Sequence, residues 1–198
     1  MELTWRQITV TVATMTFIYG ASYCNGETIV VPETKVKTVE MKVTKVKFDS
    51  ARQFVEELNK VIPQDTQGIL RSIILGQAVL ESWRSETHSL SKLASMNNLF
   101  GMKQSSTTNY RVVAFKTQEF INGEEKTVKE EFCIYKSWEQ CLEHYFHILA
   151  KDRYAFVTLQ PSAKWQAEEI AKVYATDPEY GVKLLEIIEE LKLEKFDK

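Results

Sequence analysis

An Asn122-Gly123 pair, flanked by residues that suit β-strands, most constrains how this 198-residue chain can fold. Asn-Gly is a strong signal for a two-residue hairpin turn. The stretches 110–120 and 126–135 are therefore expected to form two antiparallel strands. Helical periodicity precedes this hairpin and resumes after it, so the order is helices, one hairpin and more helices. That order predicts an α+β domain, with a mostly helical body and a small β-hairpin lobe.

Apolar residues at helical spacing indicate where the helices lie. Asp49 or Ser50 is expected to cap a first helix, which Pro63 ends. Pro178 suits the first position of the last helix. The other expected helices are 66–83, 90–95, 138–149, 163–174 and 178–193.

Near the N-terminus, Arg6 precedes an apolar run at positions 8–24. A membrane span needs about 20 apolar residues, so this shorter run looks more like the core of an export signal. Residues 1–24 are therefore predicted to be a signal peptide or a membrane or lipid anchor, with a buried helix as the alternative. Valine and lysine roughly alternate in residues 25–47, which predicts an extended tether. Residues 48–198 are expected to be the folded domain.

Composition and cysteine usage narrow the function classes. The net charge of −2 gives no reason to expect a nucleic-acid partner, and no nucleotide-binding or zinc-finger motif is evident. Cys133 and Cys141 could pair outside the cytoplasm, but two buried thiols are favoured because Cys141 falls on an apolar helix face. His144 and His147 lie three apart without a third ligand, so neither a metal nor another cofactor is expected.

One apolar helix face ends on a carboxylate. Glu81 is expected near a helix C-terminus, which does not favour negative charge. Partial burial beside Trp83 and Phe100 would also disfavour the charged form, so the pKa of Glu81 is predicted to be raised. A raised pKa suits a general acid. The alternative is a surface ion pair with Arg84 or Lys103. The residues that share the face are Leu70, Ile73, Ile74, Gln77, Ala78 and Glu81.

Several blocks of sequence occur in a characteristic order between about residue 50 and the C-terminus. They are 77–82 (QAVLES), 93–94 (LA), 97–103 (NNLFGMK), 117–120 (TQEF), 132–139 (FCIYKSWE) and 174–180 (YATDPEY). These blocks resemble the glucosaminidase domain of glycoside hydrolase family 73. The resemblance implies a lysozyme-like fold and an endo-β-N-acetylglucosaminidase, which hydrolyses the β-1,4 bond of peptidoglycan after N-acetylglucosamine. It also implies that Glu81 is the catalytic acid.

The resemblance suggests two further catalytic residues. Glu119 looks like the family's hairpin glutamate, so it is predicted to act as a base or to stabilise positive charge, as glycosidases generally require. A β lobe that closes over substrate would bring Glu119 to the bond. The alternative is a solvated hairpin residue. Tyr174 resembles the family's active-site tyrosine and is predicted to orient the reacting sugar, with helix packing as the alternative.

Other residues are candidates for substrate binding. Asn98 could hydrogen-bond a sugar or brace its loop. Trp83 and Tyr110 could stack on sugar rings, although core packing is the default expectation for these residues and for Phe100. A cap for the last helix is the favoured interpretation of Asp177, ahead of direct catalysis.

The sequence departs from the family pattern at two places. The usual glycine is missing after Ser82, and His144 stands where many members carry an acidic residue. Rival interpretations are a muramidase or lytic transglycosylase, and a non-catalytic module for wall binding or assembly. The expected protein is exported to the cell envelope, acts as a monomer on peptidoglycan strands, and attaches to the membrane, if at all, through its N-terminus.

Overall fold

The computed structural model describes residues 48–105, 109–121 and 124–197, so the predicted signal, the tether and the Asn122-Gly123 turn lie outside the described residues. The first part contains α1 (Ala51–Val61), α2 (Arg71–Ser82), β1 (Trp83–Arg84), η1 (Ser85–Thr87), β2 (Ser89–Leu90) and η2 (Ala94–Met96). The long hairpin follows, with β3 (Arg111–Ile121) and β4 (Glu124–Ile134). The last part contains α3 (Trp138–Leu149), η3 (Asp152–Tyr154), α4 (Ala155–Thr158), α5 (Ala163–Tyr174), α6 (Tyr180–Leu191) and η4 (Leu193–Phe196).

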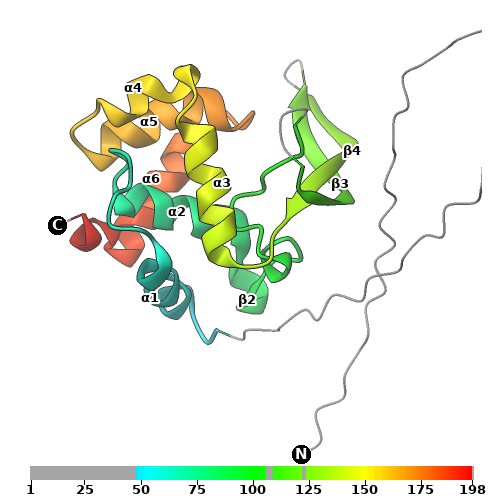
Figure 1. The fold of residues 1–198 in the computed structure, drawn as a ribbon, viewed down its shortest axis with the longest axis horizontal. Helices are drawn as coiled ribbons and strands as arrows, with labels where there is room; N and C mark the ends of the chain where they lie inside the picture. Colours follow the sequence, from blue (N-terminus) through cyan, green and yellow to red (C-terminus); the bar gives the residue numbers. More distant parts are fainter. Residues whose placement is uncertain (1–47, 106–108, 122–123, 198) are drawn as a thin grey trace, which may run out of the picture. The chain divides into compact units, whose positions relative to one another are not determined.

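The predicted fold class is confirmed. Helices form the body, and the β3–β4 hairpin projects from it (Figure 1). Helices α3 and α5 occupy the predicted ranges. Local caps account for the starts of α1 and α3, because Ser50 Oγ accepts the Gln53 N–H at 3.2 Å and Ser137 Oγ accepts the Gln140 N–H at 3.4 Å.

Helix α2 is the central helix of the body. It contacts α1, α5, α6 and η4, and residues 72–79 are all buried. A helix that is apolar on nearly every side is expected at such a position. Gly76 permits a close approach between α2 and α6, because a Cβ at this position would lie 2.8 Å from Leu184 Cδ1. The core therefore forms around the helix that carries Glu81.

The prediction that the second helix starts near residue 66 was wrong, because α2 begins at Arg71. Gln67 and Gly68 both have positive φ, 54° and 82°, and this left-handed backbone cannot belong to an α-helix. The residues that satisfy the start of α2 lie far along the chain: Gln166 Oε1 accepts the Leu70 N–H at 2.9 Å, and Asp197 Oδ1 accepts the Ser72 N–H at 2.8 Å.

Two other predicted elements need correction. The segment expected to be a helix at 90–95 instead contains the end of β2 and the 3-10 helix η2, so the described chain has a second, short hairpin between β1 and β2. The last helix starts at Tyr180 rather than Pro178, and it ends at Leu191 because Lys192 takes a left-handed conformation with φ of 55°.

The long hairpin is tied to the body at its base. Strands β3 and β4 pair antiparallel from Arg111↔Ile134 to Ile121↔Glu124. The loop after η2 adds an isolated bridge, Lys103↔Phe132.

Cys133 and Cys141 are both buried free thiols, as the favoured interpretation predicted. Among helices of the described residues, none combines the length and apolar character that crossing a membrane requires.

Candidate active site

Glu81 lies in the last turn of α2 and is half-buried, as the sequence predicted for the candidate acid. Its Oε1 accepts a hydrogen bond from the Tyr180 phenol at 3.0 Å. On its other side lies Gly101, where an added Cβ would come within 3.3 Å of Oε2. Glu81 is therefore held between α6 and the loop at 97–103, with one carboxylate oxygen on each side.

A buried chain of hydrogen bonds leads to Glu81. The Tyr145 phenol donates to Gln77 Oε1, and Gln77 Nε2 donates to the Tyr180 phenol oxygen at 2.9 Å. Burial raises the pKa of Tyr145 and Tyr180 well above the ordinary tyrosine value, and the Glu81 charge adds to this effect at Tyr180. Both phenols therefore stay protonated and can act as donors.

The loop at 97–103 is braced by its second asparagine. Asn98 Oδ1 accepts the Met102 N–H at 2.9 Å, and Asn98 Nδ2 donates to the carbonyls of Met102 and Cys133 at 2.9 and 2.8 Å. Ser82 Oγ adds a bond to the Leu99 carbonyl at 2.7 Å. The buried Asn98 amide thus fixes the loop between α2 and β4, and these contacts favour bracing over a direct bond to sugar.

Phe100 and Tyr174 make different contacts with this loop. The Phe100 ring is buried and stacks on Tyr145 with ring centroids 4.1 Å apart. The Tyr174 phenol donates to the Phe100 carbonyl at 2.7 Å. Burial raises the pKa of Tyr174 well above its ordinary value, and the nearby Tyr180 and Glu81 add to the shift. Tyr174 is therefore a protonated phenol near the candidate acid, while Phe100 supports the loop from within.

Asp177 lies in the turn before α6, whose N-cap residue is Glu179. Its Oδ1 accepts the Glu179 N–H at 2.9 Å, and its Oδ2 accepts a charged hydrogen bond from Lys183 Nζ at 2.6 Å. These two interactions lower the pKa of Asp177, with the Lys183 bond as the larger cause. The carboxylate closes the turn that leads into α6, so its favoured interpretation as a helix cap needs correction: it bonds the cap residue Glu179 and not a backbone N–H of the helix.

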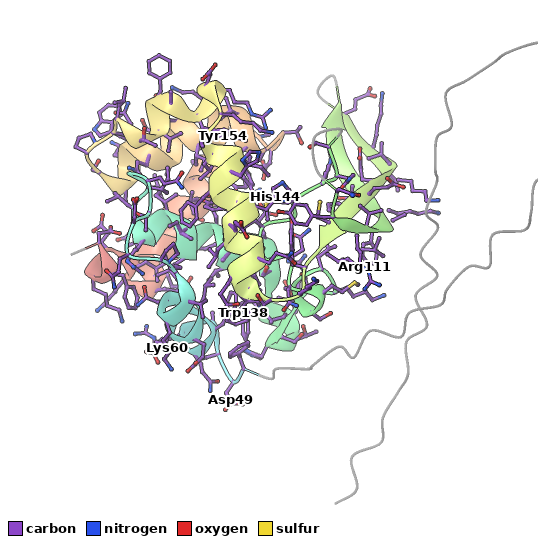
Figure 2. All side chains as sticks on the ribbon, in the orientation of Figure 1. Asp49, Lys60, Arg111, Trp138, His144 and Tyr154 are labelled. Atoms are coloured by element: carbon purple, nitrogen blue, oxygen red, sulfur yellow. The ribbon has the colours of Figure 1, made fainter. Side chains whose placement is uncertain are left out.

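The other aromatic candidates pack against different neighbours. The Trp83 ring stacks on Phe54, with centroids 6.5 Å apart, and Trp138 meets the same ring edge-on at 5.6 Å. The ring centroids of Tyr110 and His144 lie 4.6 Å apart. Figure 2 labels His144 on α3. Trp83 and Tyr110 are half-buried, so each keeps part of its surface open, and stacking on sugar stays a prediction for both.

Glu119 lies in the outer part of β3, where its Cα pairs with Lys126. Val113, opposite Phe132, marks where the loop meets the hairpin, and Glu119 is six residues further along the strand. At about 3.3 Å per residue this is about 20 Å of extended strand. Glu119 thus lies well out along the hairpin from its base, and its role at the scissile glycosidic bond stays a prediction.

Sequence reasoning missed the roles of Tyr180 and Gln77. A signal was present, because Gln77 is a polar residue within an otherwise apolar helix face, four residues before Glu81. A buried amide needs hydrogen-bond partners, so Gln77 pointed to a polar contact inside the core. The described residues contain no cluster of three or more His, Cys, Asp or Glu side chains able to hold a metal ion.

Comparison of the sequence and fold with known proteins identifies the family of this chain. A family model described as mannosyl-glycoprotein endo-beta-N-acetylglucosaminidase matches residues 59–193. The peptidoglycan hydrolase FlgJ of Escherichia coli (strain K12) is 38% identical over 128 residues, covering 63% of this chain and 41% of FlgJ. A probable N-acetylmuramidase of Lactococcus lactis (subsp. lactis, strain IL1403) is 36% identical over 142 residues, covering 67% of this chain and 31% of that protein. A C-terminally truncated glycoside hydrolase domain from Salmonella typhimurium FlgJ has a TM-score of 0.53 and 31% identity, and covers 72% of this chain and 98% of that one.

A central helix ending at a half-buried glutamate, a braced loop over it and a projecting hairpin define a glycoside hydrolase domain of lysozyme-like fold. Within this class, the chain belongs to the glucosaminidase family, whose model matches most of the described residues. The chain spans less than half the length of the curated relatives named above, 41% of FlgJ and 31% of the muramidase.

Proposed function

We propose that this domain hydrolyses peptidoglycan at the β-1,4 bond after N-acetylglucosamine, with Glu81 as the general acid. The position of Glu81 carries the proposal: it is half-exposed at the end of a buried helix, and the residue facing its Oε2 is a glycine. In the reaction Glu81 gives its proton to the leaving glycosidic oxygen as the bond from that oxygen to C1 breaks. Water then supplies the hydroxyl that bonds to C1, and its remaining proton passes to a carboxylate that acts as the base.

The test compares the full chain with Glu81→Gln on purified peptidoglycan, followed by reduction and mass spectrometry. Loss of the acid should lower the rate by roughly 10²- to 10⁴-fold. Glu86→Gln is the matched control, because Glu86 is an exposed glutamate of η1, and it should match the parent. Equal rates for the parent and Glu81→Gln would rule out this acid.

The second carboxylate of the proposed mechanism is Glu119, which would activate water or stabilise the positive charge that develops on the sugar. Glu119→Gln should lower the rate by about 10²-fold or more without changing the melting temperature. Glu124→Gln removes the same charge from the facing strand, where Glu124 is exposed, and should have little effect. Similar rates for both variants would exclude Glu119.

The proposed role of Tyr174 is to orient the reacting sugar. Its phenol lies near Glu81 and donates to the Phe100 carbonyl, so a sugar acetamido oxygen could take the place of this acceptor. Tyr174→Phe should then raise KM or lower kcat while leaving the product ends unchanged.

A muramidase is the second candidate, because one relative is described as a probable N-acetylmuramidase. The same product analysis separates the two. Reduced N-acetylglucosamine ends support a glucosaminidase, whereas reduced muramic acid ends indicate a muramidase and anhydro-muramic ends indicate a lytic transglycosylase. If the folded parent releases nothing from several wall types but binds them, the non-catalytic module is the better description.

We also propose that the protein acts as a monomer in the cell envelope and that residues 1–24 direct its export or anchor it. The support is the apolar run at positions 8–24, together with the description of the relatives as peptidoglycan hydrolases. Residues 1–24 fused to a reporter should carry it across or into the membrane. A reporter that stays in the cytoplasm would contradict this part of the proposal. Light scattering on purified protein would test the monomer.

A further inference from the structure

The hydrogen bonds behind Glu81 have a fixed direction. The Tyr145 phenol donates to Gln77 Oε1, which turns the amide nitrogen of Gln77 toward Tyr180. Because Gln77 Nε2 is a donor, the Tyr180 oxygen must be the acceptor of that bond. The single proton of the Tyr180 phenol is then free to be donated to Glu81 Oε1, 3.0 Å away.

This direction distinguishes the two oxygens of the Glu81 carboxyl. Oε1 accepts a hydrogen bond from Tyr180, and the carbonyl oxygen of a carboxylic acid is a better acceptor than its hydroxyl oxygen. The proton of the acid form is therefore favoured on Oε2. On the loop side Oε2 faces Gly101, where an added Cβ would lie 3.3 Å away.

We infer that Tyr180 is a positioning residue, which holds Oε1 of Glu81 as an acceptor and so places the catalytic proton on Oε2. Gln77 and Tyr145 act one and two steps further back, by keeping the Tyr180 phenol turned toward Glu81. The inference rests on the proposed function of Glu81 as the acid.

The role of Tyr180 depends on how α2 and α6 pack together. Tyr180 is the first residue of α6, and Gln77 lies in α2. The two helices run antiparallel, as the approach of Gly76 to Leu184 and the bond between Glu81 and Tyr180 show. The titratable groups around Glu81 in the described residues include the phenols of Tyr180, from α6, and Tyr174, at the end of α5.

The test is the pH dependence of kcat for the full chain and for Tyr180→Phe, on soluble uncrosslinked peptidoglycan strands. Losing a hydrogen bond to a charged group should lower kcat by roughly ten- to a hundred-fold, with little change in KM. The alkaline limb should move to higher pH, because the ionised form of Glu81 loses a donor that stabilised it. Tyr145→Phe should shift the limb in the same direction by less.

Tyr154→Phe is the matched control, since Tyr154 is another buried tyrosine that donates to a backbone carbonyl, that of Val173, outside this chain of bonds. It should keep the parent's alkaline limb, even if its melting temperature falls. A Tyr180→Phe variant whose alkaline limb coincides with the parent's would overturn the inference, whatever its kcat. An inactive parent, or an active Glu81→Gln, would instead overturn the proposed function, so the two failures are distinguishable.

Discussion

Gly101 has a left-handed backbone, with φ of +63°, and faces the Oε2 of Glu81. Two separate requirements therefore meet at one residue. The backbone conformation favours glycine because it costs other residues about 1–2 kcal/mol. At the site, a Cβ would lie 3.3 Å from the carboxylate oxygen that we propose carries the proton, so Glu81 would have to move by a few tenths of an ångström.

Gly101→Ala should therefore abolish most of the activity while lowering the free energy of unfolding by only about 1–2 kcal/mol. Gly68→Ala separates the two effects, because Gly68 also has a left-handed backbone, with φ of +82°, but faces Thr158. It should show a similar loss of stability with normal activity. If both variants lose activity equally, backbone strain rather than access to Glu81 is responsible.

His144 is a buried histidine whose charge the fold disfavours. Burial lowers its pKa to about 4 from the ordinary 6.5, and the nearby His147 and Lys151 contribute. Its Nδ1 and the Tyr135 phenol share a hydrogen bond at 2.7 Å. His144 is thus part of the core.

This depressed pKa predicts how stability depends on pH. Below about pH 6.5 this histidine binds a proton in the unfolded chain but stays neutral in the folded state down to about pH 4. Its contribution to the free energy of unfolding is therefore complete above pH 6.5 and is lost as the pH falls toward 4. His144→Gln should flatten the decrease in melting temperature across that window. His88→Asn, at an exposed left-handed position, should leave the parent's slope unchanged. Identical slopes for the parent and His144→Gln would contradict the burial argument.

Among the elements, the pairing of α2 with α6 determines the site geometry. A Cβ at Gly76 would lie 2.8 Å from Leu184 Cδ1 and 3.0 Å from Ile188 Cγ1, distances at which something must move. A Cβ at Gly181, on the α6 surface that faces α5, would lie 3.3 Å from Ala171 Cβ. Substitutions at these two glycines thus test separately the packing of α6 against α2 and against α5.

Gly76→Ala should lower the free energy of unfolding by about 1–3 kcal/mol and also reduce activity, because α6 carries Tyr180. Gly181→Ala should be nearly neutral, since its milder crowding is offset by the better helix propensity of alanine. Urea denaturation and activity assays of both variants measure these effects. A Gly76→Ala protein as stable as Gly181→Ala would show that α2 and α6 can separate at no cost.

Elements with local signals could be predicted, and those that depend on distant residues could not. Ser137 caps α3 from the adjacent residue, and the predicted range was correct. The predicted start of α2 was wrong because its partners are Gln166 and Asp197, which no local pattern connects to it. Strands β1 and β2 have two residues each, too few to show alternation. Glu81 could be singled out because it continues an apolar helix face and lies in a block that resembles the family, and its catalytic role is still a proposal. The contact of Tyr180 with it depends on a helix pairing that sequence spacing does not reveal.

At the scale of the whole domain, the C-terminal segment completes the central helix. Asp197 Oδ1 accepts the Ser72 N–H at 2.8 Å, and Oδ2 accepts the Ser72 hydroxyl at 2.7 Å. A carboxylate at a helix N-terminus also interacts favourably with the helix dipole. Residues 125 positions apart thus share one cap, and the stability of α2 depends on the docking of η4.

Asp197→Ala should lower the free energy of unfolding by about 1–2 kcal/mol, the usual cost of a lost helix cap. Glu194→Ala is a suitable control, because it removes an exposed acidic side chain from η4. Thermal unfolding of both variants would measure the difference. Equal melting temperatures would mean that the first turn of α2 finds other partners, such as water.

The bond between Tyr180 and Glu81 joins residues 99 positions apart, and this has a consequence for biosynthesis. A nascent chain that has not yet emerged past α6 already contains Glu81 but lacks the Tyr180 phenol that donates to its Oε1. Under the proposed function, the positioning of Glu81 is therefore completed only when α6 has formed. A fragment that ends before α6 should show little of the proposed hydrolase activity, even though it contains Glu81.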